Sequence, residues 1–154
     1  MRKWLGLLSA LLTSMALAGP MPYDEHADAK AELAQALMAA RTDHVPVLVI
    51  LGANWCEDCR ALDAAIKSEK TAQLMASRFK VVKVDVGNFD HNLDIAAAYG
   101  NPIKKGIPAA VVLSSDNQVI YATRAGELAD ARSMSETGIY DFFVKVSQTA
   151  PSQP

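Results

Sequence analysis

Residues 45–52, which read VPVLVILG, constrain the fold of this chain more than any other stretch. The run is almost wholly apolar, so both faces of the strand that it predicts are apolar. Such a strand belongs in the middle of a sheet that helices cover on both sides. Pro46 is tolerated because it lies at the first residues of the strand, where a missing N–H does little harm. The sequence GANWCEDC ends this segment, and a helix should begin around Cys56 or Glu57.

Helices and strands alternate along the rest of the chain. A helix over residues 24–41, capped by Asp24, has the i, i+3, i+4, i+7 spacing of one apolar face; this face is Leu33, Ala36, Leu37 and Ala40. Further helices are expected after Cys56 and over 71–77, 93–99 and 138–147. Strands are expected at FKVVKVDVG and in a hairpin of GIPAAVVL and VIYAT. This order predicts an α/β fold with one mixed sheet and helices on both faces.

The first 18 residues have the pattern of a secretory signal peptide. Arg2 and Lys3 precede a mostly apolar run, and small residues end at Ala18, where we expect cleavage. The run is shorter than the about 20 apolar residues that span a bilayer, so we expect no stable membrane insertion. The sequence thus predicts a signal peptide (1–18), a linker (19–27), one folded domain (28–147) and a disordered tail (148–154). Export predicts a periplasmic or secreted protein.

Charge and cysteine content narrow the possible functions. The formal net charge is −2, and nucleic-acid binding normally needs a basic face, so no nucleic-acid partner is expected. Cys56 and Cys59 are the only cysteines of the chain. Export allows disulfides to persist, but a small exported domain that needs them for folding usually has more than one pair. The two cysteines are therefore predicted to be reactive rather than structural.

A C-x-x-C motif where a strand ends and a helix begins suits thiol–disulfide exchange. Cys56 would lie at the helix N-terminus, where unpaired N–H groups and the helix dipole favour a thiolate. Cys59 would lie one turn later, more buried and within disulfide distance. The Cys56 thiolate would attack a substrate disulfide, and Cys59 would then resolve the mixed disulfide.

Three other interpretations of the cysteines stay open but have weaker support. A structural disulfide across so short a loop would contribute only about 2 kcal/mol. A zinc site needs four ligands, and His26, His44 and His91 are not at the spacing of a zinc finger. An incidental pair of buried cysteines would not require the strand–loop–helix setting. We therefore expect no metal and no cofactor apart from a redox-active Cys56–Cys59 disulfide.

The segments VLVILGANWCEDC, VVKVDVGN and YGNPIKKGIPAAVV together resemble the thioredoxin family over residues 28–147. The resemblance is closest to exported members, including disulfide isomerases. It implies a thioredoxin-like fold in which Cys56 and Cys59 are catalytic and Ile107-Pro108 is a cis peptide facing them. It also implies that Trp55, Ile107 and Pro108 contact the substrate.

The chain departs from the family pattern in ways that bear on its chemistry. Ile50 occupies the position of a buried aspartate that assists proton transfer from the resolving thiol, so another base, water or Glu57 must substitute. Two acids, Glu57 and Asp58, replace the usual Gly-Pro between the cysteines. Residues 101–105 and 126–137 are longer than thioredoxin needs, and either shape a substrate groove or form plain surface loops.

A lysine on the second predicted strand is also part of the resemblance. Lys83 and Asp85 point to the same face of that strand, and in the family a lysine at this position lies beneath the active site. A lysine near the thiols would favour their thiolates. The alternative is an exposed Lys83–Asp85 pair at the sheet edge.

The acids between the cysteines indicate the direction of the redox chemistry. Glu57 and Asp58 oppose the ionisation of Cys56, because they are like charges to its thiolate. A less stable thiolate shifts the equilibrium from the dithiol towards the disulfide, so the dithiol is a better reductant. We therefore expect reduction or isomerisation of disulfides rather than their oxidation.

The expected partners are disulfide-containing exported proteins and an upstream thiol electron donor. The chain lacks a dimerisation domain, so we expect a monomer. A function of a different class is a non-catalytic binding module of thioredoxin fold, which would assist metal-site or haem-protein thiol maturation.

Overall fold

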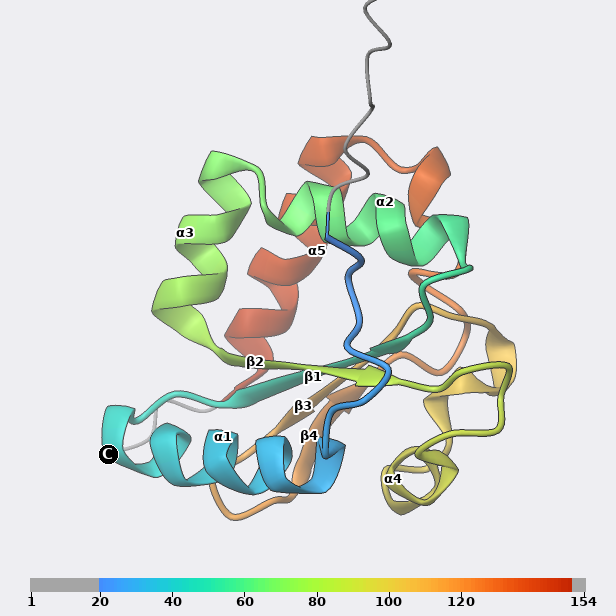
Figure 1. The fold of residues 1–154 in the computed structure, drawn as a ribbon. Coiled ribbons are helices and arrows are strands. Elements are labelled where there is room, and N and C mark those ends of the chain that lie inside the picture. Colours follow the sequence, from blue (N-terminus) through green and yellow to red (C-terminus); the bar gives the residue numbers. More distant parts are fainter. Residues whose placement is uncertain (1–19, 151–154) are drawn as a thin grey trace, which may run out of the picture.

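The computed structural model describes residues 20–150 and shows one mixed four-stranded sheet (Figure 1). Its strands are β1 (Val47–Gly52), β2 (Lys80–Asp85), β3 (Ala109–Leu113) and β4 (Val119–Ala122). The strand order is β2-β1-β3-β4, with β1 parallel to β2 and antiparallel to β3. Every residue of β1 is buried, as its continuous apolar sequence predicts.

Helices cover both faces of this sheet, as Figure 1 shows. They are α1 (Ala29–Asp43), α2 (Glu57–Ile66), α3 (Glu69–Arg78), α4 (Leu93–Ala98) and α5 (Glu136–Thr149), with short 3-10 helices η1 (Pro102–Lys105) and η2 (Ala131–Ser133). The α1 and α4 helices pack on one face, and α2, α3 and α5 pack on the other. Val49 and Leu51 of β1 face the first layer, whereas Leu48 and Ile50 face the second. The predicted α/β class and thioredoxin-like arrangement are confirmed.

Two predicted helices have different bounds in the structure. The first helix begins at Ala29 rather than at residue 24, because Asp28 is its N-cap and accepts a hydrogen bond from the Ala31 N–H at 3.0 Å. The last helix begins earlier and ends later than residues 138–147. Ser135 caps it by accepting from the Gly138 N–H at 3.0 Å, and the helix continues to Thr149, into the predicted tail.

The segment before α1, predicted as a linker, packs against the folded domain. Tyr23 is only 4% exposed and belongs to the hydrophobic cluster on the α1 side of the sheet. The chain crosses the β2 edge of the sheet here, from the side of α2 to the start of α1 (Figure 1). Pattern analysis missed this burial because a lone aromatic residue in a polar segment has no periodicity. The predicted signal peptide lies outside the described residues.

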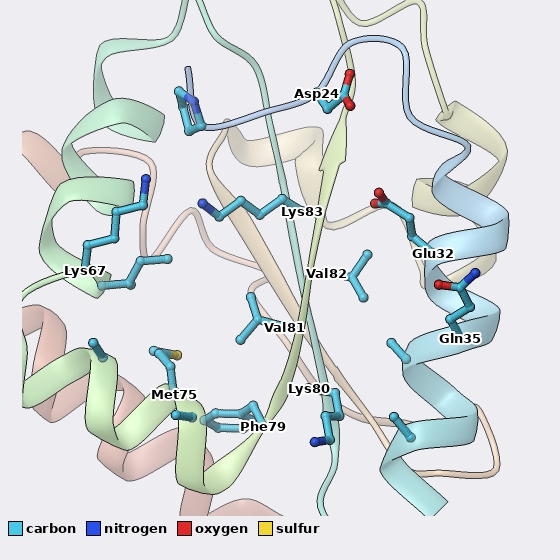
Figure 2. A pocket seen from close by; sticks show the side chains of 16 residues that line it. Asp24, Glu32, Gln35, Lys67, Met75, Phe79, Lys80, Val81, Val82 and Lys83 are labelled. Carbon is cyan, nitrogen blue, oxygen red and sulfur yellow. The ribbon is translucent and has the colours of Figure 1, made fainter. Parts of the chain in front are cut away.

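Strand β2 forms one edge of the sheet and the floor of an open groove between α1 and α3 (Figure 2). The groove has a volume of about 980 Å³, and its lining includes Val82, Met75 and Phe79 but neither cysteine. Within residues 20–150, no helix has the length and apolar character needed to cross a membrane.

Candidate functional site

The two cysteines form a disulfide at the first turn of α2. Cys56 is the N-cap residue with an extended backbone, and Cys59 lies in the turn that follows, with 5.2 Å between the two Cα atoms. The backbone N–H of Cys59 donates to the Cys56 Sγ at 3.1 Å. The first N–H groups of a helix have no intrahelical acceptor, so one of them is available to stabilise charge on this sulfur.

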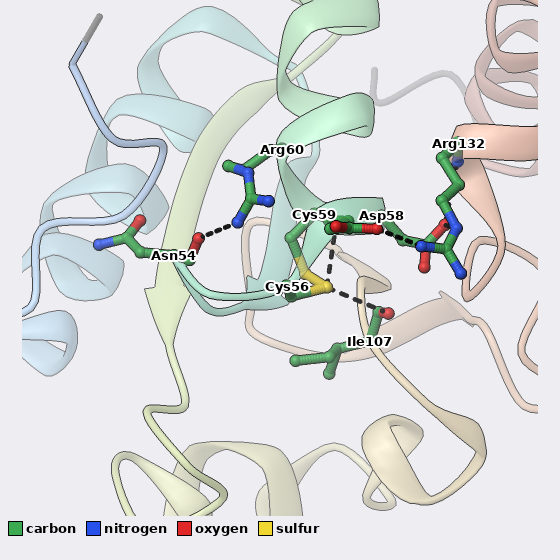
Figure 3. Close-up of polar contacts among 8 residues, drawn as sticks. Asn54, Cys56, Asp58, Cys59, Arg60, Ile107 and Arg132 are labelled. Carbon is green, nitrogen blue, oxygen red and sulfur yellow. Dashed lines mark hydrogen bonds and ion pairs between the residues drawn. A yellow bond between two sulfur atoms is a disulfide. The ribbon is translucent and has the colours of Figure 1, made fainter. Parts of the chain in front are cut away.

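The loop before β3 contacts the sulfur of Cys56. Ile107-Pro108 is a cis peptide, and the carbonyl oxygen of Ile107 lies 3.6 Å from the Cys56 Sγ (Figure 3). Cys59 is 1% exposed and Cys56 is 5% exposed. The structure thus brings together the predicted residues Cys56, Cys59, Ile107 and Pro108, and both cysteines are buried, Cys59 slightly more than Cys56.

Trp55, the residue before Cys56, forms an exposed aromatic pair with Phe89. Trp55 is 54% exposed, and its Nε1–H donates to the Gly87 carbonyl at 2.9 Å. Its ring meets Phe89 edge-on with 6.1 Å between centroids. Phe89 is 45% exposed and has a left-handed backbone (φ 61°), which is uncommon for a residue other than glycine. Sequence analysis missed Phe89, because an isolated aromatic residue in a polar loop gives no pattern.

The two acids between the cysteines are paired with an arginine from a distant segment. The guanidinium of Arg132, in η2, forms an ion pair with Glu57. The Arg132 backbone N–H donates to the Asp58 Oδ1 at 3.0 Å, and its Nε lies 3.7 Å from the same oxygen (Figure 3). The extra residues 126–137 therefore do not form a plain loop, because they supply a positive charge beside the disulfide.

The loop that carries Trp55 is fixed from two sides. Arg60 donates from Nη1 to the Asn54 carbonyl at 2.7 Å. The side-chain amide of Asn54 pairs with the backbone of Tyr23: Asn54 Oδ1 accepts from the Tyr23 N–H, and Asn54 Nδ2 donates to the Tyr23 carbonyl, both at 2.9 Å. These bonds join the N-terminal segment to the loop that immediately precedes Cys56.

Behind the disulfide, Ile50 is buried where the resemblance places an acid. A small space beside it and Cys59 is lined by Tyr23, Asp63 and Lys83. Lys83 pairs with Asp63 of α2 and not with Asp85, which corrects the predicted Lys83–Asp85 alternative.

Two lysines hold Asp63 as a carboxylate. Lys67 Nζ lies 2.7 Å from its Oδ2, and Lys83 pairs with its Oδ1. Burial alone would raise the pKa of Asp63, but the hydrogen bonds and charges of these two lysines outweigh burial and lower the pKa below its ordinary value. Sequence analysis missed Asp63, although its position four residues after Cys59 places the two side chains on one helix face.

A second carboxyl group lies at the end of β2. Asp85 is buried, and its Oδ2 accepts from the Gly87 N–H at 3.1 Å. Its Oδ1 is the one buried side-chain N or O atom without a hydrogen-bond partner in the part of the chain that the structure describes. Burial raises the pKa of Asp85.

Metal chemistry has no visible site in residues 20–150, where no group of three or more His, Cys, Asp and Glu side chains could hold a metal ion. The redox-active group that the structure does contain is the Cys56–Cys59 disulfide.

Comparison with known proteins places this geometry among redox proteins. The family described as thioredoxin-like matches residues 28–115. The crystal structure of a disulphide isomerase from Xylella fastidiosa Temecula1 is 55% identical, with a TM-score of 0.83, over 84% of this chain and 99% of that one. A structure described as DsbH oxidoreductase shares the fold at 16% identity and a TM-score of 0.57, over 94% of both chains. A comparison with curated proteins gives no match.

Replacing Asp63 with Asn should lower the free energy of unfolding near neutral pH by about 2 kcal/mol, because hydrogen bonds to a charged group are lost. The folded-state pKa of Asp63 is lowered, so the carboxylate stabilises the fold fully above its ordinary pKa and loses this effect as the pH falls through the folded-state value. The difference from wild type should therefore shrink below about pH 4.

Urea unfolding at about pH 7 and about pH 3 measures this difference. Asp116→Asn is the matched control, because Asp116 is exposed and pairs only loosely with Arg41. A deficit in Asp63→Asn that is equally large at both pH values would contradict the ionic role of this carboxylate.

Proposed function

The chain belongs to the thioredoxin-like family and is a thiol–disulfide oxidoreductase, and we propose that it reduces or isomerises disulfides in exported proteins. Cys56 is the attacking sulfur and Cys59 the resolving one. The observation that carries this proposal is the position of Cys56 at the N-terminus of α2, with the Cys59 N–H on its sulfur and the Ile107 carbonyl 3.6 Å away.

The reaction transfers two electrons from the cysteine pair to the substrate. In the reduced protein, the Cys59 N–H and the α2 dipole stabilise the Cys56 thiolate. This thiolate attacks one substrate sulfur, forms a mixed disulfide and releases the other substrate sulfur as a thiolate. Cys59 then attacks the Cys56 Sγ, which restores the Cys56–Cys59 disulfide and releases the second substrate thiolate. In isomerisation, a substrate thiol resolves the mixed disulfide instead.

The charges around Cys56 support a reducing or isomerising role. Glu57 and Asp58 contribute two negative charges next to the sulfur, and Arg132 compensates only one of them. The remaining negative charge opposes the thiolate more than neutral residues would, so the reduced state is less favoured and the dithiol is the better reductant.

The surface beside Cys56 supports a polypeptide substrate. Trp55, the residue before Cys56, and Phe89, which contacts it, expose apolar rings, and exposed apolar surface can mark a binding site. The Ile107 carbonyl, in the cis peptide with Pro108, lies 3.6 Å from the Cys56 Sγ, and we assign Ile107 and Pro108 to substrate contact. The partners that we propose are disulfide-containing proteins of the periplasm or the exterior and a thiol donor that reduces the pair, with the protein acting as a monomer.

Reduction of insulin in the presence of dithiothreitol tests the exchange activity. We expect turbidity to develop faster with the protein than with dithiothreitol alone, and the Cys56→Ser/Cys59→Ser variant to lose this acceleration. Activity that survives in the double variant would contradict the exchange mechanism and favour a non-catalytic binding module.

Replacing Cys59 with Ser should trap substrates, because the mixed disulfide on Cys56 can no longer be resolved from within the protein. Directed to a Gram-negative periplasm, Cys59→Ser should give thiol-sensitive adducts that mass spectrometry identifies as disulfide-containing proteins. Cys56→Ser is the control and should give far fewer adducts. Equal trapping by both variants would contradict the assigned order of the two cysteines.

Replacing Arg132 with Gln should make the cysteine pair more reducing, because the acids beside Cys56 would lose their compensating charge. The ion pairs are exposed, so the expected shift is small, about 15 mV more negative. Equilibration with glutathione measures the potential, and Arg132→Lys, which keeps the charge, is the control. A shift in the positive direction would contradict the electrostatic account.

A further inference from the structure

We propose that the hydroxyl group of Tyr23 donates a hydrogen bond to the Cys59 thiolate and thereby promotes the step in which Cys59 resolves the mixed disulfide. This inference rests on the proposed function and adds a residue outside the C-x-x-C motif to it. The N-terminal segment would then supply the polar group that the sheet lacks at Ile50.

The geometry around Gly52, the last residue of β1, places the two groups together. A Cβ atom added to Gly52 would clash with the Tyr23 hydroxyl and would lie 2.8 Å from the Cys59 Sγ. The hydroxyl and the sulfur therefore both lie next to the position that a Gly52 side chain would occupy. Gly52 has no side chain, and this leaves room for both atoms to approach.

The position of Tyr23 is fixed by the same loop that carries the disulfide. Its backbone makes two hydrogen bonds with the Asn54 side chain, both of 2.9 Å, and the Asn54 amide also donates to Glu25 at 2.9 Å. Figure 1 shows the segment crossing the β2 edge of the sheet before α1 begins. These bonds hold the Tyr23 hydroxyl near Cys59, although Tyr23 lies outside the sheet.

Burial and the charged groups near Tyr23 keep its hydroxyl protonated, so that it can donate a hydrogen bond. Burial, followed by the negative charges of Asp63 and Asp85, raises the pKa of Tyr23 well above its ordinary value. Lys83, which lines the same small space, is paired with Asp63, and Glu25 adds a further negative charge near Asp85. The phenol therefore keeps its proton at every pH at which exchange proceeds.

A buried resolving thiol needs such a donor. Cys59 is 1% exposed, and loss of water makes its thiolate costly unless another group hydrogen-bonds to it. Of the residues that line the space beside Cys59, Ile50, Leu62 and Ile66 are apolar, and Asp63 and Lys83 are paired with each other. The Tyr23 hydroxyl is the remaining polar group among them.

The resolving step balances without any further reagent. Cys59 loses its proton and its thiolate, held by the Tyr23 O–H, attacks the Cys56 Sγ. The Cys56–Cys59 bond forms while the bond between Cys56 and the substrate sulfur breaks, so the substrate sulfur takes the electron pair. It leaves as a thiolate and accepts the proton that Cys59 gave up.

Tyr23→Phe tests the inference, because it keeps the buried ring and removes only the hydroxyl. In a Cys56→Ala background, where Cys59 is the single thiol, alkylation by iodoacetamide as a function of pH gives the ionisation midpoint of Cys59. We expect Tyr23→Phe to raise this midpoint by about one pH unit, since a hydrogen bond to a charged group is lost. An unchanged midpoint would overturn the inference.

Tyr99→Phe is the matched control. Tyr99 is also a buried tyrosine, but its hydroxyl donates to Asn117 Oδ1 at 2.8 Å, on the β3–β4 hairpin. Its removal should leave the Cys59 midpoint in place, and an equal rise in both variants would show a general effect of packing and overturn the inference.

A measurement on the intact protein keeps the test independent of any folding defect in the variants. With ¹³Cζ-labelled tyrosine, the Tyr23 resonance should shift on reduction of the disulfide and again as Cys59 ionises, whereas the Tyr99 resonance should not. A Tyr23 resonance insensitive to both changes would overturn the inference. None of these readouts uses a protein substrate, so their failure is distinct from a failure of the insulin and trapping experiments.

Discussion

The site depends on one hydrogen bond at the first turn of α2, from the backbone N–H of Cys59 to the Cys56 Sγ. Thiol–disulfide exchange requires Cys56 to react as a thiolate. The Cys59 N–H, 3.1 Å from the Cys56 Sγ, supplies part of the stability of that thiolate. The N–H points at Cys56 because α2 begins immediately after the loop that leaves β1. The burial of every residue of β1 between two helical layers fixes where that loop can lie.

The charges near the disulfide form two separate groups with different effects. On the surface, Arg132 pairs with Glu57 and Asp58 beside the attacking sulfur. Behind the disulfide, Lys83 pairs with Asp63, next to the resolving sulfur. Because Lys67 and Lys83 both pair with Asp63, the second group leaves no excess of acid beside Cys59, whereas the acids of the first outnumber their one cation beside Cys56.

The sequence was sufficient for features that depend on local patterns. The apolar run of β1, the hairpin of β3 and β4 and the position of Cys56 at a helix start follow from spacing and from turn residues. The contacts of Arg132 with Asp58, of Tyr23 with Asn54 and of Lys83 with Asp63 span 74, 31 and 20 residues. A sequence pattern does not indicate which distant side chains will be in contact, so these three contacts could not be predicted. Asp63 is different, because its place on the helix face of Cys59 was already visible in the sequence.

The environments of the two sulfurs bear on whether reduction or isomerisation dominates. The acids beside Cys56 disfavour its thiolate, and the Tyr23 hydroxyl, on the proposed role, favours that of Cys59. Isomerisation requires a mixed disulfide that persists until a substrate thiol reaches it, whereas reduction requires Cys59 to act first. A resolving thiol that ionises readily shortens the life of the mixed disulfide. On the roles proposed for these residues, the arrangement would favour reduction, with isomerisation limited to substrates whose own thiol already lies close to the mixed disulfide.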